Sequence, residues 1–593
     1  MAGIDYAIVC AYLAFAVGVG VAFRKKASAS TEDFFLGGRS LPWWLVGTSI
    51  VATTYAADTP LAVTEMTREH GLWRNWYWWN ITVYHVLVVF LFARLWRRAN
   101  VITENELLEI RYEGTSAAVL RGFKATYSAI ILNLLIMGWV VRAVSSIFST
   151  VLGVDQWTVT LACLLVAVFY ATLSGYYGVV VTDLVQFLIA IGGSIYLAVV
   201  SVRHVGGMAA LEDAVLSSEG RTFLDFTPPL DLSAGWSSDF LGFLVFLGVM
   251  WWAHPSSDGG GYVIQRISSC KDENHAVWAV LSSSVMTIVR AWPWILVAVV
   301  SVPLFPDLGG HPLGHSAAYP LVMNALLGPG FKGLLLTAFL AAFMSTIDTH
   351  LNWGASYITV DLYKRFLRPD AEERHYVLVS KAAMVALVVG AGVAATFIRS
   401  ISAAWEFAFL MGCGIGLVLI LRWFWWRINA TSEIVALASS TLLAFVNLLL
   451  VQVAPDTPLL GFTVGEMPWH VKALIIVPLT TMAWLLATFL TRPVSVPRLA
   501  AFCQLVSPGG AWGPVPPESR GDGRAVLSRA FVGSWIAGMA LIIGLNLGLG
   551  ALLLGRTLPG TILIVVGIAG LAWILATGSV ARDEAPPPGA LPR

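Results

Sequence analysis

Long apolar runs, separated by short polar segments, are the dominant pattern in this chain. Residues 129–141, 159–173 and 531–554 contain no charged side chain. A helix that crosses the ~30 Å hydrocarbon core of a bilayer needs about 20 mostly apolar residues. A membrane β-barrel would instead show segments of about ten residues with alternating polarity, which we do not find. The pattern therefore predicts an all-α polytopic membrane protein.

A hydropathy window places about fifteen spans along the chain. Placing the N-terminus outside gives the inner segments most of the lysine and arginine, for example Arg97 and Arg98. Because basic loops stay on the cytoplasmic side, we expect a multi-pass protein of the cytoplasmic (inner) membrane with its N-terminus outside and its C-terminus inside. The approximate span cores are residues 5–23, 42–66, 75–97, 123–150, 156–173, 179–202, 238–256, 277–303, 330–352, 376–397, 402–421, 431–454, 470–491, 529–554 and 557–577.

The first span is followed, not preceded, by the basic residues Arg24, Lys25 and Lys26. A signal peptide has its positive charge before the apolar segment and a cleavage site after it. We therefore expect this segment to be a retained transmembrane helix.

Composition narrows the function classes. Only 12% of the residues are charged, against about 25% in soluble domains. The net charge of +1 offers no basic surface for nucleic acid. The five cysteines are scattered without paired spacing, so we expect no disulfide framework and no zinc site.

Two of the predicted spans are interrupted by polar residues and proline or glycine. The first interruption covers residues 52–60 and contains Asp58 and Pro60; the second covers residues 251–261 and contains Pro255 and Asp258. Unwound backbone at membrane depth is tolerated only where it is buried or lines a cavity. Five spans lie from the first interruption up to the second, so the two run in opposite directions. This parity predicts an inverted repeat of five plus five helices with the site between the broken pair. The alternative is that Pro255 and the glycines after it simply end a helix in a loop.

Four motifs resemble the sodium:solute symporter family, which includes the sodium–glucose, proline and pantothenate cotransporters. They occur in the family's order within residues 33–366. They are Asp33-Phe34-Phe35-Leu36-Gly37-Gly38-Arg39-Ser40-Leu41-Pro42-Trp43-Trp44, residues 175–186 from Gly175 to Gln186, Tyr262-Val263-Ile264-Gln265-Arg266, and residues 341–349 leading to Asp361-Leu362-Tyr363-Lys364.

The resemblance implies a LeuT-like core with one extra N-terminal helix and about four extra C-terminal helices. We expect an extra helix in residues 1–32, a transport core in 33–427 (repeats about 42–203 and 238–426), and extra helix pairs in 428–492 and 529–578. A cytoplasmic linker would occupy 493–528, and a disordered tail 579–593.

The resemblance also implies a sodium ion as the coupling ion. Its ligands would be backbone carbonyls of Ala52, Tyr55 and Ala342 and the hydroxyls of Ser345 and Thr346. Hydroxyls of this kind can also serve ordinary helix packing. A second cation site or exit path would involve Asp183, Asp348 and Thr349. The alternative for Asp348 is an ion pair with a basic residue such as Arg142 or Arg290.

The candidate substrate residues lie on the interrupted helices and their neighbours. Arg142 would suit a carboxylate if it faced the cavity; otherwise it would neutralise Asp58 or Asp183. The aromatic segment Trp73–Trp79 departs from the polar character expected of a sugar site, which argues against glucose-like specificity. The candidates are Thr54, Asp58, Thr59, Trp78, Arg142, Ser256, Ser257 and Asp258.

We therefore predict a secondary active transporter that couples a small organic solute to sodium by alternating access, functional as a monomer in the lipid bilayer. Proton-coupled symport and a transporter-like solute sensor remain alternatives. An enzyme is not expected, because His85, His254 and His350 are isolated from any nucleophile or metal-ligand set. The identity of the solute stays open.

Overall fold

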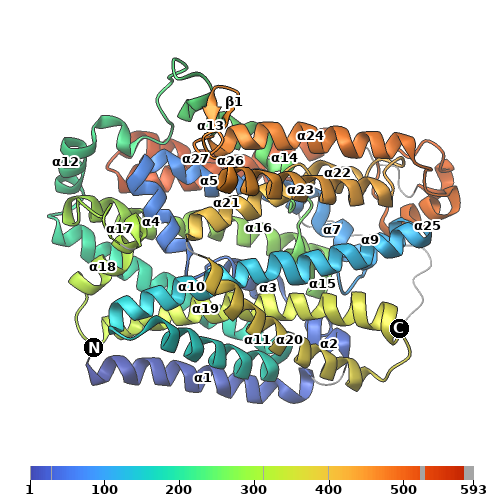
Figure 1. Ribbon diagram of the computed structural model, residues 1–593, viewed down its shortest axis with the longest axis horizontal. Coiled ribbons are helices and arrows are strands. Elements are labelled where there is room, and N and C mark those ends of the chain that lie inside the picture. Colours follow the sequence, from blue (N-terminus) through green and yellow to red (C-terminus); the bar gives the residue numbers. More distant parts are fainter. Residues whose placement is uncertain (1, 28–29, 312, 399, 521–527, 580–593) are drawn as a thin grey trace.

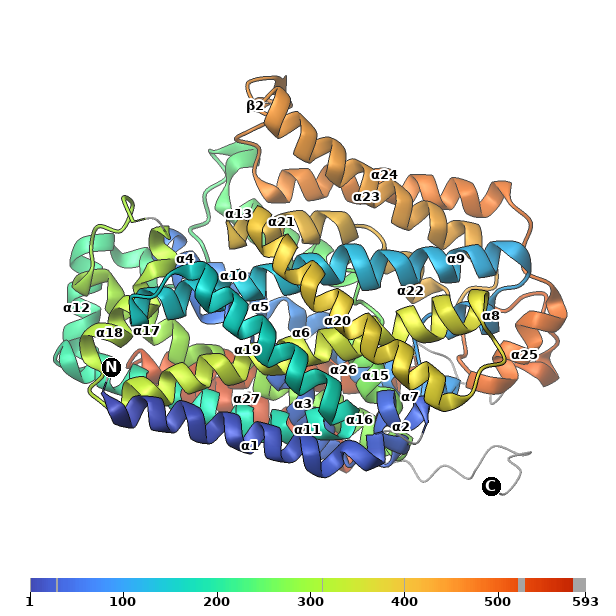
Figure 2. The same ribbon diagram turned by 60° about the horizontal axis from the view of Figure 1, so that its bottom comes forward.

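The computed structural model describes residues 2–27, 30–311, 313–398, 400–520 and 528–579. Within these residues the regular secondary structure is helical apart from one two-stranded hairpin, β1 (Pro458–Leu459) and β2 (Phe462–Thr463). Long helices such as α1 (Gly3–Ala27) and α24 (Trp469–Leu490) run across the molecule in both views (Figures 1 and 2), between an end that carries α12 (Met208–Glu219) and an end that carries α25 (Val496–Val506). We call these the α12 end and the α25 end.

Eleven helical segments of the described chain are long and apolar enough to cross a membrane. The predicted spans at 42–66, 156–173, 238–256 and 402–421 are absent from this set because the structure interrupts or shortens their helices. The eleven are Gly3–Phe23, Leu72–Ala99, Gly114–Leu152, Gly175–His204, Glu273–Leu304, Phe331–Leu367, Glu373–Phe397, Ala430–Val453, Trp469–Leu490, Arg529–Leu553 and Thr557–Ala576.

The first five spans of the core begin with a broken helix. After α2 (Thr31–Leu36) and η1 (Gly37–Arg39), the chain forms α3 (Trp43–Thr53) and α4 (Thr59–His70), with residues 54–58 unwound between them. The kink between the fourth and fifth spans is at Gly175, whose φ of 55° lies in the left-handed region that glycine tolerates. The remaining elements are η2 (Leu72–Asn75), α5 (Trp76–Trp79), α6 (Ile81–Leu87), η3 (Val88–Phe92), α7 (Ala93–Ala99), α8 (Glu106–Arg111), α9 (Gly114–Thr126), η4 (Tyr127–Leu132), α10 (Asn133–Leu152) and α11 (Gln156–His204).

The second five spans begin with a broken helix as well. It comprises α13 (Asp239–Val245), η7 (Phe246–Met250), α14 (Trp251–Ala253) and, after the break at 254–260, α15 (Gly261–Ser269). The last span is also interrupted, between α21 (Ile401–Gly412) and α22 (Gly416–Leu421), which the sequence pattern does not predict. The remaining elements are η5 (Arg221–Leu224), η6 (Gly235–Ser237), α16 (Glu273–Val289), α17 (Ala291–Leu304), η8 (Gly314–Ala317), α18 (Ala318–Leu326), α19 (Phe331–Ser356), η9 (Tyr357–Leu367) and α20 (Glu373–Phe397).

The interruption in the last span fits against the break in the second broken helix. The backbone N–H of Gly414 donates to the Ala253 carbonyl at 2.9 Å. A Cβ added at Gly416 would lie 2.3 Å from the His254 carbonyl oxygen and 2.4 Å from that of Trp252. Only glycine allows the two backbones to approach this closely. The two interruptions are therefore packed directly against each other.

The C-terminal helices surround this core. They are α23 (Ala430–Val453), α24, α25, η10 (Pro517–Ser519), α26 (Arg529–Leu553) and α27 (Thr557–Ala576). Helix α25 lies inside the segment predicted as a linker and buries Leu499, Phe502, Cys503 and Val506. Their helical spacing was hidden by the surrounding proline and glycine. The predicted tail lies outside the described residues from 580 onward.

A buried ion pair fastens the second broken helix to the last core span. The Asp258 carboxylate accepts from the Arg422 guanidinium at 2.6 Å and from the Trp423 indole N–H at 3.0 Å. Arg422 also contacts Glu433 at 3.3 Å, and both members of the Asp258–Arg422 pair are 1% exposed. Removing one member of a buried pair leaves the other charge uncompensated.

We therefore expect Asp258→Ala to lower the unfolding free energy by about 3 kcal/mol, the lower end of the usual range, because Glu433 remains beside Arg422. Thermal unfolding of the purified protein in detergent measures the effect. Asp456→Ala, which removes an exposed loop carboxylate, is the matched control. Equal unfolding temperatures for the two variants would contradict a structural role for Asp258.

Candidate solute and cation sites

The first broken helix presents carbonyl oxygens at the end of α3 that no helical N–H can reach. The Arg290 guanidinium of the 273–304 span donates to the Val51 and Thr54 carbonyls, each at 2.5 Å. Thr346 of α19 donates its hydroxyl to the Thr53 carbonyl at 3.0 Å. The C-terminal end of a helix carries partial negative charge and favours cations. This unwound turn is therefore held by one fixed cation and one hydroxyl.

Three of the five residues predicted as sodium ligands lie on one stretch of α19 at this point. The Thr346 hydroxyl is also 3.0 Å from the Ala342 carbonyl, and Ser345 donates to Asp183 of α11 at 2.5 Å. On the α3 side, the Ala52 carbonyl accepts from the backbone N–H of Tyr55 at 3.0 Å. The structure thus brings the Ala52–Tyr55 turn and the Ala342–Thr346 segment together through the Thr346–Thr53 contact.

Asp183 is the acceptor at the centre of a buried polar network. Ser49 of α3 and Ser345 each donate to it at 2.5 Å, and Arg266 of α15 lies 3.7 Å away. Arg266 donates in addition to Ser49 at 3.0 Å, to Thr53 at 3.1 Å and to Thr349 at 2.6 Å. Arg266 therefore links both broken helices to α11 and α19.

The central place of Arg266 in this network does not follow from the sequence, where it is part of the Tyr262–Arg266 motif. The predicted spans 238–256 and 277–303 leave residue 266 between them, so no signal of membrane depth marked it. The partner that the sequence suggested for the acids, Arg142, instead donates to Gln156 at 3.0 Å.

Asp348 is a buried acid that forms no ion pair with any residue that the structure describes. It is 1% exposed, and neither carboxylate oxygen has a hydrogen-bond partner among the described residues. Arg142 and Arg290, the two candidates for an ion pair with it, bind Gln156 and the α3 carbonyls instead. Asp183 and the Tyr12 hydroxyl of α1 are close enough to interact with it electrostatically. An uncompensated carboxylate here is expensive unless a cation or proton joins it.

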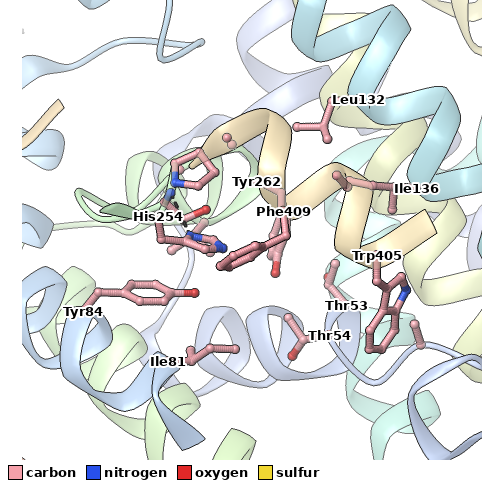
Figure 3. Close-up of a pocket in the computed structure, with 18 of the residues that line it drawn as sticks. Thr53, Thr54, Ile81, Tyr84, Leu132, Ile136, His254, Tyr262, Trp405 and Phe409 are labelled. Carbon is pink, nitrogen blue, oxygen red and sulfur yellow. Dashed lines mark hydrogen bonds between the residues drawn. The ribbon is translucent and has the colours of Figure 1, made fainter. Parts of the chain in front are cut away.

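A cavity of about 440 Å³ lies between the two broken helices. Figure 3 shows Ile81 and Thr54 on one side of it, Phe409 on the other, and Trp405 at one end. Its volume is in the ~300–1,000 Å³ range of small-molecule sites. Of the predicted substrate residues, five line it: Thr54, Asp58, Thr59, Trp78 and Ser256.

The other three predicted substrate residues are placed elsewhere. Asp258 pairs with Arg422, Arg142 with Gln156, and the Ser257 hydroxyl donates to the Trp251 and His254 carbonyls at 3.0 and 2.5 Å. None of them is among the residues that line the cavity. Ser257 instead satisfies backbone groups that the break leaves free.

Comparisons with known proteins agree with this architecture. The model of the sodium:solute symporter family matches residues 34–439. A sodium/glucose cotransporter of Vibrio parahaemolyticus is 26% identical over 464 residues, covering 74% of this chain and 83% of that protein. A sodium/mannose cotransporter of Bos taurus is 24% identical over 417 residues, covering 65% and 68%. A sodium/myo-inositol cotransporter 2 of Oryctolagus cuniculus is 23% identical over 480 residues, covering 75% and 70%.

Among solved structures, a Na⁺-coupled sialic acid symporter in its substrate-bound outward-open state superimposes with a TM-score of 0.66 at 19% identity. The superposition covers 83% of this chain and 99% of that one. At this identity the likeness shows the fold, and it confirms the predicted polytopic helical architecture with a LeuT-like core. Because the family model covers more than half of the chain, this protein belongs to the sodium:solute symporter family and is a transporter, not an enzyme.

Proposed function

We propose that this protein carries a small organic solute across the cytoplasmic membrane together with sodium, by alternating access. The observation that carries the proposal is the meeting of the α3 carbonyl end with Ser345 and Thr346 beside Asp183. Sodium is a hard cation that takes carbonyl, hydroxyl and carboxylate oxygens. The sodium-coupled relatives named above support the same assignment.

In this proposal the carbonyls of Ala52, Tyr55 and Ala342 and the hydroxyls of Ser345 and Thr346 hold the ion. A bound cation would draw the α3 end and α19 together. Because α3 belongs to the first repeat and α19 to the second, the ion would bias the relative position of the two repeats. The solute would occupy the cavity next to the same break and join the ion before the repeats rock.

The protein would act as a monomer with its N-terminus outside and its C-terminus inside. The α12 end would then be external and the α25 end cytoplasmic. This orientation follows from the distribution of basic residues along the spans.

Ser345→Ala combined with Thr346→Ala should weaken sodium binding, because two oxygen ligands are lost. We expect the sodium concentration for half-maximal thermal stabilisation to rise about tenfold or more, which corresponds to about 1.4 kcal/mol. Titrating the detergent-purified protein with sodium chloride at constant ionic strength, with potassium chloride as the balance, measures it without knowledge of the solute.

Thr337→Ala on the same helix is the matched control, because its buried hydroxyl has no partner among the described residues and lies well before Ala342. An unchanged sodium midpoint in the double variant would rule out this assignment.

Asp348 favours a second cation site, which we assign to Asp183, Asp348 and Thr349. The unpartnered Asp348 carboxylate beside Asp183 needs a compensating charge. Proton coupling is the competing function that the same observation supports, since a proton on Asp348 would compensate the charge equally well.

Asp348→Asn distinguishes these two functions. If Asp348 binds sodium, the sodium midpoint rises and the Hill coefficient of sodium stabilisation falls towards one. A sodium titration at two pH values, one acidic and one alkaline, makes the comparison. Suppose instead that the variant has the wild-type sodium midpoint and that this midpoint no longer changes with pH. Asp348 would then bind a proton, and the second sodium site would be contradicted.

A further inference from the structure

The cavity is lined by five charged side chains, and four of them have partners. Glu104 and Lys124 form an ion pair of 3.4 Å. Glu433 accepts from Arg422 at 3.3 Å and from the Tyr112 hydroxyl at 2.5 Å. Arg290 is occupied by the α3 carbonyls. The fifth is Asp58.

Asp58 is 2% exposed and forms no ion pair with any residue that the structure describes. Its carboxylate oxygen Oδ1 has no hydrogen-bond partner within the described chain. An unpaired buried carboxylate costs several kcal/mol, so the site is poised for a compensating group. A ligand that enters the cavity can supply one, because Asp58 is part of the cavity wall.

Asp58 lies at the N-terminus of a helix. It is the N-cap residue of the 12-residue helix α4, where the helix dipole is positive. In transporters with broken helices, such half-helix N-termini commonly point at anionic groups of the substrate. Here the protein's own carboxylate holds that position. An anionic solute group would therefore be repelled at this point, and a cationic group attracted.

The surroundings of Asp58 are aromatic. Eleven of the residues that line the cavity are Phe, Tyr or Trp. Trp139 and Trp405 both lie close enough to the Asp58 carboxyl group to interact with it. The Trp405 ring centre is 6.2 Å from that of Trp139 and 4.8 Å from that of Trp78. Aromatic faces around a carboxylate attract ammonium groups by cation–π interaction.

The uncharged polar side chains of the cavity are mainly hydroxyls, among them Thr54, Thr59 and Ser256, and histidines. Asn80 is the sole amide side chain among the lining residues. Its Nδ2 already donates to the Trp76 and Tyr77 carbonyls at 3.0 and 2.7 Å. Each solute hydroxyl buried without a partner would cost about 1–3 kcal/mol. Eleven aromatic residues on the lining favour an apolar solute body over a sugar or inositol.

We infer that the solute is an organic cation: an amine or quaternary ammonium group on an apolar body. Its positive centre would rest against Asp58 between Trp139 and Trp405, and its apolar part on the aromatic wall that includes Phe409. The inference rests on the proposed symport function, because it takes the cavity as the transport site.

Thermal stabilisation of the detergent-purified protein by a matched probe series tests the inference. The cationic probes are 2-phenylethylamine and phenyltrimethylammonium. The uncharged analogue is 2-phenylethanol, the anionic analogue is 3-phenylpropanoate, and the polyhydroxylated probes are D-glucose and myo-inositol. Each is measured in sodium chloride and in equimolar potassium chloride. We expect stabilisation by the cations only, and more of it in sodium.

Asp58→Asn should weaken binding of the cations about tenfold or more, by loss of the charge. Its stabilisation by sodium alone should stay unchanged, which shows that the variant is folded. Asp213→Asn, an exposed acid on α12, is the matched control and should bind as the wild type does. If Asp58→Asn does not fold, Asp58→Glu should still prefer 2-phenylethylamine over 2-phenylethanol.

Several outcomes would overturn the inference: no response to either cationic probe, stabilisation by the acid or the sugars instead, or cation binding that survives in Asp58→Asn. A response to cations that is equal in sodium and potassium would preserve the cation site and contradict sodium coupling. Stabilisation by sodium together with a response only to the sugars would preserve sodium coupling and contradict the cation site. The two proposals therefore fail separately.

Discussion

Each break in a membrane helix leaves backbone N–H and C=O groups that lipid cannot hydrogen-bond. In the core of this protein, side chains and backbone groups, most of them from other spans, bind these groups. At the first break, Arg290 and Thr346 reach the carbonyls of Val51, Thr54 and Thr53 from two other spans. At the second, the Ser257 hydroxyl and the Gly414 N–H donate to carbonyls of α14. The elements that satisfy the breaks are thereby fixed in register, and their positions determine the shape of the cavity between the breaks.

Charge is distributed over this frame unevenly. Several buried acids are paired within the bundle, among them Asp183 with Arg266 and Asp258 with Arg422. Two others, Asp58 and Asp348, have no ion pair among the described residues. A structure that pairs some buried charges closely can leave others open only where something outside the chain completes them. The two unpaired acids belong to the two proposed sites, Asp58 to the solute cavity and Asp348 to the second cation site.

The sequence was sufficient to predict the broken helices, because proline, glycine and acids at membrane depth are tolerated in few other arrangements. It was also sufficient to predict the family, because four motifs occur in the order found in sodium:solute symporters. It could not predict which arginine meets which acid, because Arg266 and Asp183 lie on helices distant in the sequence that only packing brings together. The same holds for Asp258, whose partner Arg422 is 164 positions away. Helix α25 was missed because proline and glycine around it resemble a linker, although its apolar positions have helical spacing.

The α3 end offers a direct physical link between ion and solute. The Thr346 hydroxyl donates to the Thr53 carbonyl, and the Arg266 guanidinium donates to the Thr53 hydroxyl. Thr53 therefore lies within the proposed sodium-binding region. Thr53 and the next residue, Thr54, both line the cavity, and Asp58 follows within the same unwound segment. Only the unwound residues between Thr53 and Asp58 thus separate the proposed sodium site from the solute cavity. This segment contains no regular helix that could absorb a movement of Thr53. If sodium draws this segment towards α19, the Asp58 carboxylate moves with it, and by thermodynamic reciprocity a solute that fixes Asp58 strengthens sodium binding by the same factor.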